Sequence, residues 1–207
     1  MKFSFLFDFD GTLVDSMPTY VSSMLRILDE NNIAYDSDIT KTITPLGLKG
    51  TADYFLNVLG LNMTKEQLVD VMKRYMLEAY FYHIPAKENV ISVLKELKIK
   101  DASLNVLTAS PHITLDACLK RLGMWELFDN IWSCDDFKTT KADPEIYVKA
   151  AKKLNTTVDK VLFLDEPTIG LDPVVKENIR TLIKRMNKEY KTTIFLTKRI
   201  KLSEFER

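Results

Sequence analysis

Two aspartates stand two positions apart near the start of the chain, in the stretch FDFDGT (residues 7–12). They end an apolar run, and side chains two positions apart in a β-strand point to the same side. Gly11 follows them and allows a sharp turn. Paired carboxylates of this kind can act as a nucleophile, exchange protons or bind a cation. An acidic strand end that simply meets solvent is the alternative, and Asp8 and Asp10 alone leave both interpretations open.

Polar residues also follow three later apolar segments. LNVLTAS ends in Thr108 and Ser110, FKTTKADPEIY contains Lys141, and VLFLDE ends in Asp165 and Glu166. In an open α/β sheet the carboxyl ends of the strands line the ligand crevice, so strands that run in parallel bring these groups together. Hydroxyl, ammonium and carboxylate groups around one crevice suit a phosphate. This convergence favours a functional site over an acidic strand end exposed to solvent.

The elements that must position these groups alternate along the chain. Short apolar or β-branched segments, typical of strands buried on both faces of a parallel sheet, lie at residues 2–9, 104–109, 130–134, 160–165 and 192–197. Amphipathic helical patterns separate several of them, at residues 88–98, 112–123 and 144–154. The alternation predicts an α/β fold with a doubly wound parallel sheet and right-handed crossovers.

One long interval breaks this alternation. Residues 17–84 show helical patterns and no convincing strand, and Thr64, with a glutamine three positions later, forms a capping box that opens one of the helices. We therefore expect an all-helical cap at residues 16–85, inserted into an α/β core formed by residues 1–15 and 86–207. An insert of this length is about the size of a small domain.

The composition is that of an ordinary soluble globular protein. Of 207 residues, 46% are apolar and 28% charged, and 29 basic residues balance 29 acidic ones. Neither a basic surplus for nucleic acid nor a membrane span is evident, and Asp8 and Asp10 interrupt the first apolar run. Cys118 and Cys134 are isolated, as expected of reduced thiols. We expect a cytoplasmic protein, monomeric or weakly dimeric, that binds neither nucleic acid nor membrane.

The order of these motifs resembles the haloacid dehalogenase superfamily, specifically its phosphoglycolate phosphatase and β-phosphoglucomutase branch. DxDGT, a helical insert, LTAS, KADPEIY and a strand ending in two acids follow one another between Met1 and Glu166. The resemblance implies a Mg²⁺-dependent phosphatase that acts on a small phosphate ester through an aspartyl-phosphate. A phosphoglucomutase-like transferase, using the same residues, remains an alternative.

Roles follow from the resemblance for the catalytic residues. Asp8 matches the nucleophile, and Asp10 matches the general acid and base. Thr108 matches the hydroxyl that hydrogen-bonds the transferring phosphoryl group. Lys141 matches the lysine that offsets negative charge, and its spacing to the following proline favours it over Lys138.

The resemblance also implies a Mg²⁺ site made by Asp8, the backbone carbonyl of Asp10, Asp165 and Glu166. A carboxylate can approach a phosphate dianion only when cationic groups offset the repulsion. The family usually has a second aspartate where this chain has Glu166, and Pro167 follows it. Because Mg²⁺ demands near-ideal octahedral geometry, a phosphate-binding protein with impaired turnover is a further alternative.

Four residues are expected to contact the substrate: Gly11, Thr12, Ser110 and Lys49. Lys49 lies in GLKGT, which resembles a cap loop that reaches the non-phosphate end of the substrate. A surface lysine in a glycine-rich turn is an equally good interpretation. His83 and His112 have no spacing typical of metal ligands, so structural or surface roles are expected for both.

The stretch VLFLDEPTIGLDP (residues 161–173) resembles a different family, the ATPases of ABC transporters, and the likeness continues to Thr197. The chain nevertheless lacks the phosphate-binding G-x-x-x-x-G-K-[ST] loop and an LSGGQ-like signature. Lys198 and Arg199 stand where the switch histidine would follow. ATP hydrolysis is therefore disfavoured, while a C-terminal segment grafted from such an ATPase remains an open alternative.

Overall fold

The computed structural model describes residues 4–156 together with two strand segments, 161–165 and 193–197. The chain divides into two compact units, one made of residues 1–14 and 85–207 and the other of residues 15–84. Glu166, one of the expected Mg²⁺ ligands, lies outside the described residues.

The first unit is built on a parallel sheet, as the sequence predicts. Its described strands are β1 (Ser4–Phe7), β2 (Ser103–Thr108), β3 (Asn130–Ser133), β4 (Val161–Asp165) and β5 (Thr193–Thr197). They form a five-stranded sheet in the order β3-β2-β1-β5-β4, with every described pair parallel. The first strand of the chain is therefore the middle strand of the sheet.

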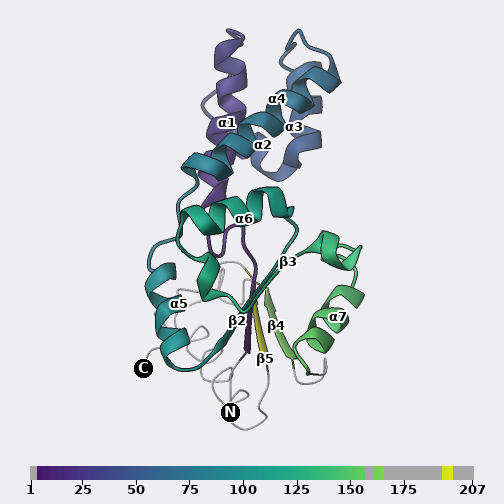
Figure 1. Cartoon of the computed structure of the whole chain (residues 1–207). Coiled ribbons are helices and arrows are strands. Elements are labelled where there is room, and N and C mark those ends of the chain that lie inside the picture. Colours follow the sequence, from purple (N-terminus) through teal and green to yellow (C-terminus); the bar gives the residue numbers. More distant parts are fainter. Residues whose placement is uncertain (1–3, 157–160, 166–192, 198–207) are drawn as a thin grey trace, which may run out of the picture. The chain divides into compact units, whose positions relative to one another are not determined.

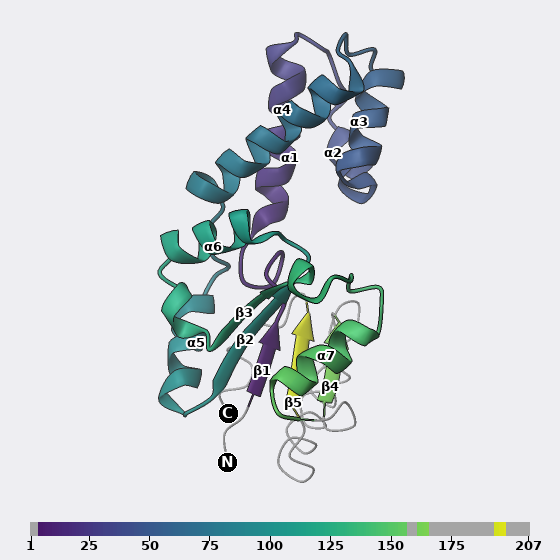
Figure 2. The same cartoon turned by 45° about the vertical axis from the view of Figure 1, so that its right-hand side comes forward.

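Helices cover both faces of this sheet (Figures 1 and 2). α5 (Val90–Ile99) and α6 (His112–Arg121) precede and follow β2, and α7 (Glu145–Lys153) follows β3. α7 lies on the opposite side of the strands from α5 (Figure 1), as right-handed crossovers require when the strand order reverses at β1. The described part of this unit also contains two short 3₁₀ turns, η3 (Trp125–Leu127) and η4 (Cys134–Phe137).

Apolar packing holds the helices to the sheet. Ile146 and Ala150 of α7 are fully buried in a cluster with Leu6 and Leu107 of the central strands, and Trp132 of β3 joins them. All but the first residue of β2 is buried, which fits a strand covered on both faces.

The second unit, residues 15–84, is helical. It contains α1 (Ser16–Glu30), α2 (Ile39–Ile43), the 3₁₀ turn η1 (Thr44–Leu46), α3 (Gly47–Asn57), α4 (Lys65–Glu78) and the π-helical turn η2 (Ala79–His83). It has a hydrophobic core of its own, centred on Met24, Phe55, Leu68 and Met72. Within the described ranges no helix combines the length and apolar character needed to cross a bilayer.

Two local features of the helical unit bear on the sequence analysis. The Thr64 hydroxyl accepts the backbone N–H of Gln67, and the Gln67 side chain accepts that of Thr64, so the predicted capping box is present. GLKGT, in contrast, is not a glycine-rich turn, because it forms the start of α3. Burial of Thr51 and Phe55 overrides the low helix propensity of its two glycines.

Candidate active site

A tight turn after β1 holds the two leading aspartates. The carbonyl oxygen of Phe9 accepts backbone N–H groups from Thr12 (3.3 Å), Leu13 (2.9 Å) and Val14 (3.2 Å). Gly11 has a φ of 73°, a left-handed value that a side chain rarely adopts, and its N–H donates to the Val14 carbonyl at 2.9 Å. The glycine is therefore needed for the turn that ends the strand.

Asp8, directly after β1, contacts Lys141 from the loop that precedes α7. Its Oδ1 accepts the backbone N–H of Phe9 at 2.7 Å and lies 2.5 Å from the ammonium nitrogen of Lys141. The side chains of Asp8 and Lys141 are only 16% and 23% exposed. Of the described residues, none hydrogen-bonds Oδ2 of Asp8. One oxygen of this carboxylate is thus held by a cation and an amide.

Lys141 is held in place through the loop that carries it. The hydroxyl of Tyr147 donates to the Lys141 carbonyl at 3.4 Å, and that of Thr139 donates to Asp143 at 2.7 Å. Asp143 also accepts the backbone N–H of Glu145 at 2.9 Å. The amide of Glu145 and the hydroxyl of Thr139 together hold the pKa of Asp143 below its usual value. This network links the loop to the first turn of α7.

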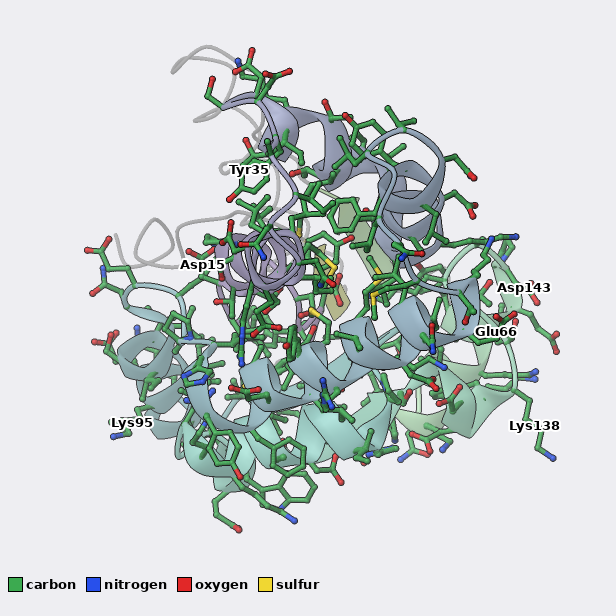
Figure 3. The ribbon with its side chains drawn as sticks, turned by 90° about the horizontal axis from the view of Figure 1, so that it is seen from above. Asp15, Tyr35, Glu66, Lys95, Lys138 and Asp143 are labelled. Carbon is green, nitrogen blue, oxygen red and sulfur yellow. The ribbon has the colours of Figure 1, made fainter. Side chains whose placement is uncertain are left out.

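Lys138, the competing lysine, does not make the contact with Asp8. It has a left-handed backbone conformation, with a φ of 52°, directly after η4, and its side chain extends outward from the ribbon (Figure 3). The structure therefore brings Lys141, and not Lys138, to the carboxylate.

The end of β2 supplies hydroxyl groups to the same region. Thr108 is 1% exposed, and its Oγ1 accepts the backbone N–H of Ser110 at 3.1 Å. Accepting that bond leaves the proton of the Thr108 hydroxyl to be donated elsewhere. The Ser110 hydroxyl donates to Oδ2 of Asp10. The loops that follow β1 and β2 are therefore tied together at the carboxyl edge of the sheet.

Asp165 lies at the same edge by strand register. Phe7 of β1 and Leu164 of β4 both pair with Leu196 of β5, so Asp8 and Asp165 occupy the same level on either side of one strand. Two interstrand spacings of ~4.8 Å place their Cα atoms about 10 Å apart. The strand register thus brings Asp165 to the same edge of the sheet as Asp8, with strand β5 between them.

The other proposed ligands and contacts stand as follows. Within the described ranges, no group of three or more acidic, histidine or cysteine side chains is close enough to hold a metal by itself. Gly11 and Thr12 belong to the turn beside Asp10. Lys49 lies in the other unit, in the first turn of α3, where it borders a pocket of about 260 Å³ with Leu48, Val69, Met72 and Lys73.

Comparison with known proteins identifies the family of this chain. Residues 5–184 match the family model for haloacid dehalogenase-like hydrolases. The chain belongs to this family. The matched range includes the first part of the stretch that resembles an ABC ATPase, so the family likeness continues past the fourth strand segment.

Similar members of the haloacid dehalogenase-like family are phosphatases by name. A phosphorylated carbohydrates phosphatase of Thermotoga maritima is 26% identical over 86% of this chain and 82% of its own length. The pyrophosphatase PpaX of Bacillus velezensis is 27% identical over 78% of this chain and 73% of its own. These relatives show that the chain is a hydrolytic enzyme of the phosphatase type.

A solved structure confirms the fold. A candidate β-phosphoglucomutase of Thermotoga maritima superimposes with a TM-score of 0.70 at 24% identity, over 80% of this chain and 77% of that one. The likeness confirms the α/β core with its parallel sheet, as expected for a haloacid dehalogenase-like hydrolase.

The structure also shows the contacts of His112, for which the sequence predicts a structural or surface role. His112 opens α6, and its Nδ1 lies 2.8 Å from Asp116 while its Nε2 lies 2.9 Å from Asp136. The hydrogen bonds to Asp116 and then Asp136 raise the pKa of His112. The i, i+4 spacing of His112 and Asp116 was a visible signal, but nothing local indicated Asp136.

Proposed function

We propose that this enzyme is a Mg²⁺-dependent phosphatase that hydrolyses a small phosphorylated metabolite through a phosphoryl group carried on Asp8. The observation that carries the proposal is the contact of 2.5 Å between Lys141 and Oδ1 of Asp8, in a setting that excludes most solvent. Phosphatases among the relatives support the reaction class. An attacking carboxylate next to a fixed ammonium meets the main requirement of phosphoryl transfer, which is to offset negative charge.

The first half-reaction transfers the phosphoryl group to the enzyme. An oxygen of Asp8 attacks phosphorus as the bond from phosphorus to the ester oxygen breaks. Asp10 gives its proton to the departing alkoxide, so that an alcohol leaves. Lys141 offsets the charge between the carboxylate and the phosphate, and the Thr108 hydroxyl is free to donate to a phosphoryl oxygen.

The second half-reaction regenerates the enzyme. Water attacks the phosphorus, its proton passes to the Asp10 carboxylate, and the bond from phosphorus to Asp8 breaks to release inorganic phosphate. Mg²⁺, held by Asp8, Asp165, Glu166 and the backbone carbonyl of Asp10, would add a second positive charge against the phosphate. We assign the unit of residues 15–84 the role of a cap that shields the substrate, with Lys49 contacting its non-phosphate part.

The test is hydrolysis of p-nitrophenyl phosphate with Mg²⁺ by the wild type and by Asp8→Asn. An amide cannot attack phosphorus as a carboxylate does, so we expect the rate to fall at least about 10³-fold. Equal rates in the two proteins would end the assignment of Asp8 as the nucleophile.

A phosphoglucomutase-like transfer would use the same residues, and the products separate it from hydrolysis. A phosphatase releases inorganic phosphate from hexose phosphates, whereas a mutase interconverts the phosphate isomers. Measuring both products from the same reaction decides between the two.

A further inference from the structure

The hydroxyl of Ser110 donates a hydrogen bond to Oδ2 of Asp10. We infer that Ser110 is a positioning residue for the general acid and base, and not a group that binds the substrate phosphate. This inference rests on the proposed function, because it assigns Ser110 a part in the proton transfers made by Asp10. It differs from the expectation drawn from the sequence, in which Ser110 contacts the substrate.

The number of protons that each hydroxyl can donate separates these two roles. A serine hydroxyl has a single proton to donate. While that proton is bonded to Oδ2 of Asp10, it is not available to a phosphate oxygen. The neighbouring hydroxyl, that of Thr108, keeps its proton because it accepts the Ser110 amide. Two hydroxyls two residues apart therefore have different partners, Thr108 for the phosphoryl group and Ser110 for the carboxyl group.

Backbone contacts fix both ends of the Ser110–Asp10 bond. On the Asp10 side, the turn closed on the Phe9 carbonyl sets the direction in which the aspartate leaves the strand. On the Ser110 side, the amide is bonded to Thr108 and helix α6 starts immediately after Pro111. The Pro111 carbonyl accepts both the backbone N–H and the hydroxyl of Thr114, at 3.0 and 2.9 Å.

His112 adds a second anchor on this side. It links Asp116 in its own helix to Asp136 in the turn η4 that follows β3. Asp136 in turn accepts the backbone N–H of Ser133, the last residue of β3, at 2.9 Å. Ser110 thus lies between two fixed points, the end of β2 and the start of an anchored helix. A hydroxyl held in this way can orient a carboxyl group to which it donates.

Orientation matters because proton transfer requires a donor and acceptor about 2.6–3.2 Å apart. Rotation of the Asp10 side chain would carry its oxygens out of that range. Loss of the Ser110 hydroxyl should therefore slow the steps in which Asp10 gives or takes a proton. The rate of attack by Asp8 should stay unchanged.

p-Nitrophenyl phosphate separates these steps. When Asp8 attacks, the bond from phosphorus to the phenol oxygen breaks and the electron pair stays on a phenolate that is stable without a proton. The first half-reaction then needs no acid from Asp10. In the second, water must give its proton to Asp10 while the bond from phosphorus to Asp8 breaks. Only this second step should depend on Ser110.

The experiment is rapid mixing of Mg²⁺-loaded enzyme with p-nitrophenyl phosphate, following phenolate release in the wild type, Ser110→Ala and Ser110→Thr. In Ser110→Ala we expect a burst of up to one phenolate per enzyme, at a first-turnover rate within about twofold of the wild type. The steady-state rate that follows should fall about 10- to 100-fold, part of the usual contribution of acid–base catalysis. Ser110→Thr keeps a hydroxyl and should recover most of that rate.

Ser92→Ala is the matched control, because Ser92 is an exposed residue of α5 whose hydroxyl donates to the nearby Asn89 carbonyl. It should match the wild type in both phases, and circular dichroism should show that all variants are folded. The inference would be overturned if Ser110→Ala slowed both the burst and the steady-state rate and needed more substrate to reach half of the maximal burst rate. That result would assign Ser110 to substrate binding. An unchanged steady-state rate would overturn it too. Absence of phenolate release by the wild type would instead overturn the proposed function.

Discussion

The ammonium nitrogen of Lys141 lies 2.5 Å from Oδ1 of Asp8, although the two residues are far apart along the chain. Both side chains are largely shielded from solvent, so water screens this pair less than it screens an exposed ion pair. A shielded cation beside the attacking carboxylate lowers the repulsion that a phosphate dianion would meet. The pair is therefore expected to act in catalysis more than in stability.

Replacing Lys141 with methionine should lower kcat/KM for a phosphate monoester about 10²- to 10³-fold, the usual effect of removing one group that stabilises transition-state charge. Lys138→Met is the matched control. Lys138 is three residues away on the same loop, and its side chain extends outward (Figure 3). We expect this control to keep its activity within about twofold, as for a surface position. Equal losses in the two variants would contradict a specific role for Lys141.

Removal of divalent cations tests the role of Asp165. The strand register puts the Cα atoms of Asp8 and Asp165 on the same level, with strand β5 between them. Chelation with EDTA should abolish turnover, and Asp165→Asn should raise the Mg²⁺ concentration for half-maximal rate about tenfold or more, because an amide is a weaker ligand for a hard cation. Asp70→Asn, on the exposed surface of α4, serves as the control. Activity that persists after complete chelation would exclude a metal-dependent mechanism.

Much of the core was predictable because its signals are local. Apolar segments of four to six residues mark the described strands. The topology of a parallel sheet then brings the residues at their carboxyl ends together, which is why Asp8 and Lys141 could be paired before their distance was known. The preference for Lys141 over Lys138 came from the family resemblance, in which the spacing of the lysine to the following proline favours Lys141.

The remaining features depend on contacts between segments distant in the sequence. The bond from Ser110 to Asp10 depends on two rotamers and two loop paths, and no periodicity encodes them. Asp136 reaches His112 only because η4 packs next to the start of α6. In the helical unit, the start of α3 contains two glycines, whose propensity opposes a helix until Thr51 and Phe55 become buried.

The capping box at Thr64 is expected to stabilise the helical unit. The Thr64 hydroxyl and the Gln67 side chain satisfy two backbone N–H groups at the start of α4, which supplies Leu68 and Met72 to the core of this unit. Thr64→Ala should therefore lower the free energy of unfolding by about 1 kcal/mol, and Thr64→Ser should preserve it. Urea titration followed by circular dichroism measures both. A loss of the same size in Thr64→Ser would contradict the capping explanation.

His112 makes stability depend on pH, with a definite sign. Its hydrogen bonds to Asp116 and Asp136 raise its pKa above the value of about 6.5 expected in the unfolded chain. A group whose pKa is higher in the folded protein than in the unfolded chain stabilises the fold. This stabilisation is complete at pH values below the pKa of the unfolded chain, and it is lost as the pH rises through the pKa of the folded protein. Burial by itself raises the pKa of Asp136, but His112 and the Ser133 amide outweigh burial and lower it, so Asp136 stays ionised down to acidic pH.

The comparison of wild type with His112→Ala at pH 6 and pH 9 follows from this sign. At pH 6 the wild type should be more stable by about 1 kcal/mol, because the ring is partly exposed and its ion pairs are screened. At pH 9 the neutral ring can donate only one of its two hydrogen bonds, so the difference should shrink. His83→Ala, which removes a ring 61% exposed and 3.8 Å from Glu78, is the control and should show no such change. Thermal unfolding measures all three proteins, and a difference that grows from pH 6 to pH 9 would reverse the assigned charge state of His112.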